Sequence, residues 1–226
     1  MTQQINRRVT VTQFVTESIR ERILSGEYAP GTKLDQLVLV GEFGASLIPV
    51  RESLRQLDAQ GFIRLYPHRG AYVADLSIAE LKEIYLVREA LEEMATRLAV
   101  PRLTERALAN LKGLVLQMES ATADCDYAGL LQLNRTFHFT IYRACDNELL
   151  IEMIEGLWDR SSRYHHLYTH LPNRAPRALA EHRLIYAACV AGDAEKAGRA
   201  VRKNVKQTVQ GLTLELQGRI RRDKAA

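Results

Sequence analysis

Apolar side chains recur every three or four residues along most of the chain, which is the spacing of one face of an α-helix. Glycine and proline interrupt this pattern, most clearly at Gly26 and at Pro30-Gly31. In the first part of the chain the pattern predicts helices at 13–24, 35–43 and 46–60, then strands at 62–66 and 71–74. Three helices followed by a hairpin in so short a stretch predict a winged helix-turn-helix.

The third of these helices carries the clearest chemistry. Gly44 suits a turn with positive φ, Ser46 is a capping residue, and Pro49 is tolerated in a first helical turn. Arg51 and Arg55 lie one turn apart and therefore share a face, beside the apolar face that packs inward. We expect this face to meet DNA phosphates or bases.

After residue 75 no segment shows the alternation of a strand. Ser77 and Glu80 have the spacing of a capping box at the start of a long helix. The periodicity predicts helices at 78–100, 104–122, 124–144, 147–168, 176–190 and 194–216. The expected fold is mainly α, with a winged helix-turn-helix at 1–75 and an all-helical bundle of about six helices at 76–226. We expect the tail from Arg219 onward to fray.

Composition is that of a globular protein, with 226 residues, 46% hydrophobic and 26% charged. The apolar runs are too short and interrupted for a bilayer span, and the first residues lack the apolar core of a signal peptide. Cys125, Cys145 and Cys189 are few and scattered, which predicts buried, reduced thiols. We expect a cytoplasmic protein.

The net charge of +4 does not reveal a nucleic-acid partner by itself. Residues 1–75 hold nine basic and eight acidic side chains, a balance of +1, and the remainder carries +3. A DNA-binding unit of this composition must gather its basic groups on one face.

Specific motifs do identify a family. The run Ser-Gly-x-Tyr-x-Pro-Gly-x-x-Leu from Ser25 is followed by Phe-Gly-x-Ser-x-x-Pro-Val-Arg-Glu-x-Leu from Phe43 and by Arg-Gly-Ala-x-Val from Arg69. These ordered matches over residues 12–75 resemble the GntR family of transcription regulators. The resemblance implies that a double-stranded DNA operator is contacted by Ser46, Arg51, His68, Arg69 and Gly70.

Two positions depart from the family pattern. Leu47 stands where the family usually carries an arginine at the start of the recognition helix. Leu37 stands where some members carry a further DNA-contacting arginine. Because an arginine–guanine contact supplies about 1–3 kcal/mol of discrimination, we expect an operator that differs from the usual one or is bound less tightly.

The second part of the chain resembles the helical effector (FCD) domain of the FadR subgroup, on the motifs Asn-x-x-Phe-His from Asn134 and Glu-His-x-x-Ile from Glu181. By that resemblance, an aspartate and three histidines hold a divalent metal such as Zn or Ni, which helps to bind a carboxylate. Here those four places are Asn134, His138, His182 and Asn204. Two of them are asparagines, which lack a charge and weaken a metal site.

Alternative interpretations of these residues remain open at this stage. His138 and His182 are either ligands, together with Asn134, or hydrogen-bonded histidines lining a pocket. Arg88 either receives an effector carboxylate or pairs with Glu92, four residues on. His165, His166 and His170 suggest a second metal site, because His166 and His170 are four residues apart. No third ligand of a suitable type lies near that pair, so a solvated or pocket-edge role is preferred.

The predicted function is a ligand-responsive transcription regulator that acts as a homodimer on a palindromic operator. The predicted effector is a small carboxylic acid bound in the helical domain. The alternative keeps this architecture, with a metal-free pocket that takes an acyl conjugate or nothing. A metal-dependent enzyme is disfavoured, since the sequence has no nucleophile motif, phosphate loop or His-Glu-x-x-His spacing.

Overall fold

The computed structural model describes residues 10–164, 167 and 174–223. Its internal contacts divide the chain into two compact units, Met1–Leu76 and Ser77–Ala226. Among the described residues, no helix combines the length and the apolarity that crossing a membrane requires. The two units are described in turn, each by itself.

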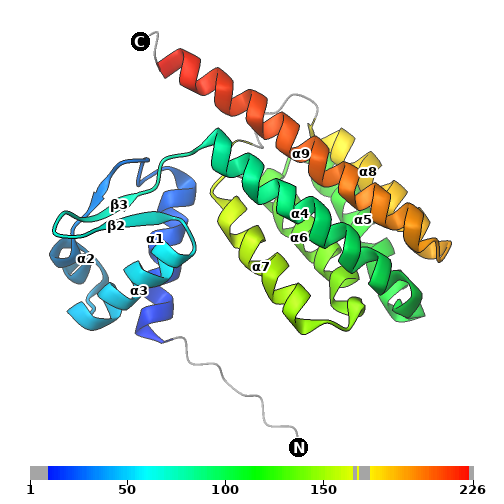
Figure 1. The fold of residues 1–226 in the computed structure, drawn as a ribbon, viewed down its shortest axis with the longest axis horizontal. Coiled ribbons are helices and arrows are strands. Elements are labelled where there is room, and N and C mark those ends of the chain that lie inside the picture. Colours follow the sequence, from blue (N-terminus) through cyan, green and yellow to red (C-terminus); the bar gives the residue numbers. More distant parts are fainter. Residues whose placement is uncertain (1–9, 165–166, 168–173, 224–226) are drawn as a thin grey trace, which may run out of the picture. The chain divides into compact units, whose positions relative to one another are not determined.

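The first unit contains three helices, which enclose its core. They are α1 Val11–Ser25, α2 Gln36–Phe43 and α3 Leu47–Ala59 (Figure 1). Val15 and Ile19 of α1 pack with Val50, Leu54 and Leu57 of α3, all of them buried. Phe14, which the periodicity placed on the inner side of α1, is instead exposed. Its ring packs edge to face against the half-buried Phe43, with ring centroids 6.2 Å apart.

A small antiparallel sheet completes the first unit. Its strands are β1 Lys33–Leu34, β2 Ile63–Tyr66 and β3 Gly70–Val73, in the order β1-β3-β2. The two-stranded wing predicted from the sequence is therefore part of a three-stranded sheet. The first strand was missed because it is two residues long, too short to show alternation.

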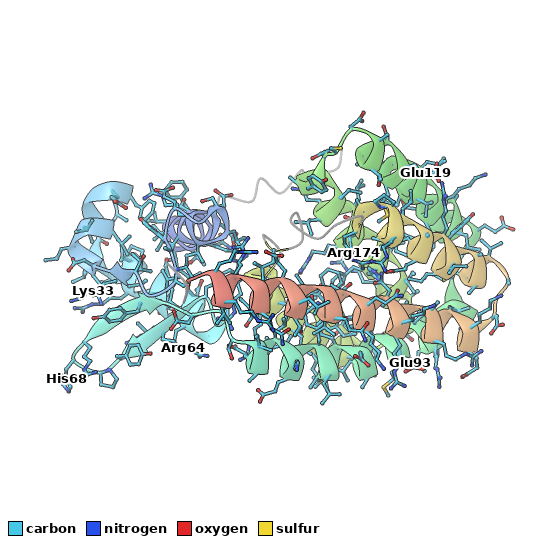
Figure 2. The ribbon with its side chains drawn as sticks, turned by 90° about the horizontal axis from the view of Figure 1, so that it is seen from above. Lys33, Arg64, His68, Glu93, Glu119 and Arg174 are labelled. Atoms are coloured by element: carbon cyan, nitrogen blue, oxygen red, sulfur yellow. The ribbon has the colours of Figure 1, made fainter. Side chains whose placement is uncertain are left out.

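The tip of the wing is a tight turn. Arg69 N–H donates to Tyr66 O at 3.1 Å, which closes a four-residue turn with Pro67 at its second position. His68 follows with φ of 61°, a conformation that a type II turn requires at this place and that glycine usually fills. The strain at His68 is tolerated, and its side chain projects from the end of the hairpin (Figure 2).

The second unit is helical throughout its described residues, apart from turns. Two long helices, α4 Ile78–Ala99 and α9 Ala194–Asp223, pack along one another (Figure 1). The others are α5 Glu105–Ala123, α6 Tyr127–Tyr142, α7 Glu148–Ser162 and α8 Arg174–Val190, with short 3-10 turns at Val100–Arg102 and Arg143–Cys145. The predicted fold class, a winged helix-turn-helix followed by a bundle of about six helices, is confirmed.

The start of α4 is held by a distant tyrosine as well as by its cap. The Ser77 side chain accepts from Glu80 N–H at 3.3 Å, as the capping box predicts. The Tyr164 hydroxyl also accepts from Ser77 N–H at 3.3 Å and donates to Ser77 O at 3.0 Å. Residues after α7 therefore fix the first residue of the helical unit.

Several details of the helical unit differ from the sequence predictions, and one of them is that α7, predicted to run to residue 168, ends at Ser162. Helix α8 begins at Arg174, two residues early, and α9 continues to Asp223 instead of fraying from Arg219. Glu215 pairs with Arg219 at 3.4 Å and with Arg222 at 3.2 Å, which supports this last part of α9. Cys125, predicted to be buried, is exposed in the turn after α5.

Candidate DNA-binding surface and effector site

Helix α3 has two chemically distinct faces. Val50, Leu54 and Leu57 are buried on one of them. Ile48, Arg51 and Arg55 are exposed, and their spacing of three and four residues puts them on one shared face. This exposed face is the surface that a recognition helix presents to a DNA groove.

The two arginines of this face are held only lightly. Arg51 Nε donates to Gln36 Oε1 of α2 at 2.9 Å, a neutral partner that positions the side chain without neutralising its charge. Arg55 approaches Glu52 at 4.0 Å, with 75% of its side chain exposed. Both guanidinium groups can therefore exchange their present contacts for phosphate or base acceptors.

Ser46 occupies the N-cap position of α3, but its hydroxyl makes no capping hydrogen bond. The sequence predicted such a bond, and this part of the prediction is wrong. An N-terminus without a side-chain cap leaves first-turn N–H groups that suit an anion. Ser46 lies at this N-terminus, and its contact with a DNA phosphate stays a prediction.

The wing residues His68, Arg69 and Gly70 lie together at the hairpin tip. His68 and Arg69 are exposed, and Gly70 has φ of 99°, which favours glycine there. A Cβ at Gly70 would also come within 3.5 Å of Lys33 Cε, so a further basic residue from β1 lies beside this part of the wing. Lys33 is a basic residue of this surface that sequence reasoning did not select.

In the helical unit, Glu92 of α4 gathers polar side chains from three helices. Arg88 Nε donates to Glu92 Oε1 at 2.6 Å, and Trp158 Nε1 donates to the same oxygen at 2.9 Å. Tyr142 donates its hydroxyl proton to Glu92 Oε2 at 2.7 Å. Arg88 is also enclosed between the rings of Tyr85 and Trp158, at 4.6 and 4.2 Å. Arg88 was expected either to receive an effector carboxylate or to pair with Glu92, and the structure shows the pair with Glu92.

The hydrogen bond from Tyr142 to Glu92 determines which ring nitrogen of His138 carries the proton. A tyrosine hydroxyl has one proton, and here Glu92 receives it. The Tyr142 oxygen, 3.0 Å from His138 Nδ1, must therefore accept a proton donated by that nitrogen. Neutral His138 then carries its lone pair on Nε2.

His182 is held in the same tautomer by the backbone. Its Nδ1 lies 2.6 Å from Ala178 O, an acceptor only, so Nδ1 carries the proton and Nε2 the lone pair. His182 Nε2 lies 2.9 Å from Asn134 Oδ1, and because that nitrogen carries the lone pair, the amide has to be turned so that its NH2 group donates to it. The two imidazoles pack edge to face, with centroids 5.1 Å apart.

Asn204 of α9 joins this group through a side-chain hydrogen bond with His138. Its amide donates to Glu181 Oε2 at 2.5 Å, and Glu181 receives both Nη atoms of Arg174, at 2.8 and 3.1 Å. Arg174 Nη2 also donates to Thr208 Oγ1 of α9 at 2.9 Å (Figure 2). We call Asn134, His138, His182 and Asn204 the histidine–asparagine cluster. Sequence reasoning found its four members but missed Arg174, Glu181 and the Glu92–Tyr142 pair that orient them.

Burial keeps this cluster uncharged. It lowers the pKa of His138 well below its usual value, and the charges of His182 and Arg88 act in the same direction. Burial lowers the pKa of His182 to about 4. Burial also raises the pKa of Tyr142 well above its usual value, with the Glu92 charge adding to the effect. Both imidazoles are therefore neutral at pH 7.

A cavity reaches the cluster from one side. Its volume is about 20 Å³, and it is bounded by Asn134 and His182 together with apolar side chains of α5, α6 and α8. Its walls include Met118, Leu130, Leu131, Ala175, Ala178 and Leu179. A volume of this size holds about one water molecule, so a larger ligand would enter only if the surrounding side chains moved.

The donor set of the cluster does not fit a tightly bound divalent metal. Two neutral Nε2 atoms are suitable zinc or nickel donors, but the other two places hold amides, which bring no charge. In the part of the chain that the structure describes, no group of three or more His, Cys, Asp or Glu side chains is arranged to hold a metal. His165, His166 and His170, the other metal hypothesis, lie outside the described residues.

These features define a class of protein: a winged helix-turn-helix with a DNA-reading face, joined to a helical unit with a buried polar site. Family models agree, since residues 11–73 match the bacterial regulatory proteins of the gntR family and residues 83–207 match the FCD domain. The chain belongs to the GntR family of transcription regulators, and its helical unit is an FCD domain.

Relatives and solved structures agree with this assignment. The chain is 30% identical to the HTH-type transcriptional regulator McbR of Escherichia coli over 205 residues, which cover 90% of this chain and 93% of the relative. It is 26% identical to the transcriptional repressor RspR of the same organism, over 92% of both chains. The structure of E. coli McbR/YncC superposes with a TM-score of 0.78 at 29% identity, covering 92% of this chain and 99% of that one. The relatives are regulators and not enzymes, which confirms that expectation.

Proposed function

We propose that this protein is a ligand-responsive transcription regulator of the FadR subgroup, acting in the cytoplasm as a homodimer on a palindromic operator. The observation that carries the ligand response is the neutral histidine–asparagine cluster beside an apolar cavity. Buried polar groups are unfavourable in a helical core unless they are hydrogen-bonded, and a few polar groups in apolar surroundings are what fixes a small molecule in its site. The exposed arginine face of α3 and the wing supply the operator contacts.

The proposed effector is a small carboxylic acid that binds without a metal. Without a metal, a cation has to come from the protein, and Arg88 is committed to Glu92 in a fully enclosed pair. Arg174 is better placed, because it lines a second hollow of about 380 Å³ together with its partner Glu181, which also holds Asn204 of the cluster. An effector carboxylate would replace Glu181 on Arg174, with the fork geometry that guanidinium groups favour.

Such an exchange links α8 to α9. Arg174 and Glu181 are on α8, and their partners Thr208 and Asn204 are on α9, which packs along α4. A ligand that changes these bonds shifts the equilibrium between two arrangements of the helices by its difference in affinity for them. Operator binding must then alter effector affinity by the same factor.

Thermal unfolding with acetate, succinate or benzoate tests the effector proposal, each with added zinc, nickel or a chelator. We expect at least one acid to raise Tm equally with and without chelator, and Arg174→Gln to remove that rise. The matched control is Arg199→Gln, which alters an exposed arginine paired with Glu195 at 3.5 Å and should leave the response intact. Stabilisation that requires zinc or nickel would contradict the metal-free proposal.

The proposed dimer uses an exposed stripe of α4. Leu86, Ala90 and Met94 recur every four residues on one face, and Leu86 and Met94 are exposed. Glu93 and Arg97 lie beside the stripe and pair with each other at 2.7 Å, so two copies related by a two-fold axis would bury the apolar stripe without opposing unpaired charges. Sedimentation should show monomer for Leu86→Glu but dimer for Leu184→Glu, a matched exposed leucine on α8.

A further inference from the structure

The most exposed large apolar side chain at the start of the recognition helix is Ile48, at 80%. A single exposed isoleucine is unremarkable on a protein surface, so exposure alone carries no meaning. The position of Ile48 in the helix is informative. Ile48 lies in the first turn of α3, and the N-terminal residues of a recognition helix are those that contact base edges.

The charged neighbours of Ile48 point to a DNA partner. Arg51 and Arg55 follow it at three and seven residues, on the same exposed face of α3. Neither contributes to a protein core, and an interface with another protein tends to exclude charges from its centre. An apolar side chain flanked by guanidinium groups fits a surface that is anionic overall but has small apolar spots, as a DNA groove has.

The major groove offers one such apolar spot. Each base pair presents hydrogen-bonding groups there, and only thymine adds a methyl group, at C5. Ile48 has no hydrogen-bonding group in its side chain, so the discrimination available to it is contact with that methyl. We propose that Ile48 reads the 5-methyl group of a thymine in each operator half-site. The proposal rests on operator binding by the α3 face, and it adds a base preference to it.

The departures from the family pattern fit this inference. Leu47 replaces an arginine just before Ile48, and Arg51 remains one turn later. The first turn of α3 therefore has lost a guanine-reading group and presents an aliphatic side chain instead. The preferred operator should shift accordingly, from guanine towards thymine at the base pair that faces this turn.

The test begins with the full-length protein and a random-sequence DNA pool, from which bound sequences are selected. In the enriched operator, each thymine is then replaced by deoxyuridine, which differs only in lacking the 5-methyl group. At one position per half-site we expect Kd to rise about four-fold for each methyl lost, the effect of removing one buried methylene-sized group. With Ile48→Ala, the same replacement should leave Kd unchanged.

The deciding comparison is whether the effect of losing the thymine methyl group depends on the Ile48 side chain. Ile48→Ala should keep the fold, because alanine is the better helix former at this exposed place, and a thermal melt checks this. The control Leu116→Ala removes an exposed leucine from α5 and should keep the full effect of deoxyuridine. If every replacement affects wild type and Ile48→Ala equally, or the operator has no thymine opposite α3, the inference is overturned. If no sequence is enriched, sequence-specific operator binding itself fails, and the inference with it.

Discussion

The DNA-facing surface and the FCD polar cluster use the same side-chain chemistry under opposite conditions. On α3, Arg55 is exposed and stands 4.0 Å from its acidic neighbour, and Arg51 contacts only a neutral glutamine in the described residues. In the helical unit, Arg88 and Arg174 are buried and lie 2.6 and 2.8 Å from glutamates. The first surface keeps its charges available, whereas the second satisfies them internally.

This difference determines how each site binds its partner. An exposed ion pair is worth only about 0–1 kcal/mol, so phosphate can replace Glu52 at Arg55 with little loss. Opening a buried pair costs several kcal/mol, so a ligand enters the cluster only if it takes over the hydrogen bonds that it breaks. In the proposed function, the DNA surface therefore exchanges its contacts at little cost, whereas the FCD site binds only by exchange of buried hydrogen bonds.

The largest effect should come from breaking the enclosed pair. Glu92→Gln leaves Arg88 buried without a counter-charge and removes one acceptor from Tyr142 or Trp158. We expect unfolding in urea to show a loss of about 3–5 kcal/mol in the helical unit. Glu52→Gln, the exposed counterpart on α3, should change stability by less than about 1 kcal/mol. Similar losses for both variants would remove the distinction between the two regions.

The next effect is a gain of metal binding. Asn134→Asp with Asn204→His would supply a carboxylate and a third imidazole beside His138 and His182. We expect this double variant to bind zinc with one-to-one stoichiometry in calorimetry. At a hundred-fold excess over Kd, zinc should stabilise it by about 3 kcal/mol.

Two control measurements test this prediction. Wild type should gain less than about 1 kcal/mol under the same conditions, because its amides bring no charge to the site. Adding His138→Ala to the double variant should abolish the gain by removing one ligand. Tight zinc binding by wild type would show instead that the asparagines do not exclude a metal.

The third effect concerns the exposed surface. Arg51→Ala removes a guanidinium that reaches the groove, and we expect operator affinity to fall by about 2 kcal/mol, roughly thirty-fold. Its Tm should stay unchanged, since the side chain makes one exposed hydrogen bond to Gln36. Gel-shift titration measures the first quantity and calorimetry the second. Unchanged affinity would remove Arg51 from the reading surface.

The sequence predicted the architecture well because the architecture depends on periodicity and capping. Thr104 accepts from Ala107 N–H at 3.2 Å, as its position before a helix indicated. The failures are of another kind: β1 is too short to show a pattern, and Phe14 fits the helical period yet faces solvent. Both depend on tertiary packing, which local sequence does not encode.

The sequence predicted which residues form the candidate site but not the hydrogen bonds that connect them. Asn134 and His182 were chosen by motif, and they do form a hydrogen bond at 2.9 Å. The connection of Glu92 to His138 through Tyr142 joins α4 to α6, a separation of 46 residues between the end members that no spacing rule reveals. Ile48 was missed for another reason, since an exposed apolar residue has no signal until its helix face is known.

The smallest effect is the pH dependence of the buried cluster. His182 has a pKa of about 4 when folded, against a usual value of 6.5, so the unfolded chain takes up its proton first as pH falls. Stability is therefore fully present above pH 6.5 and is lost progressively as pH falls towards 4. Between pH 7.5 and 5.5 the loss from this group should be about 1 kcal/mol, measured by urea unfolding with a chelator present.

His182→Gln should reduce the slope of the pH profile in this window without removing it, since glutamine does not titrate and the lowered pKa of His138 still contributes. Substitution of the exposed wing residue His68 by glutamine is the matched control and should keep the wild-type slope. Equal slopes for wild type and His182→Gln would mean that the cluster is open to water and charged. The FCD site would then resemble the exposed DNA surface, and binding by exchange would no longer follow.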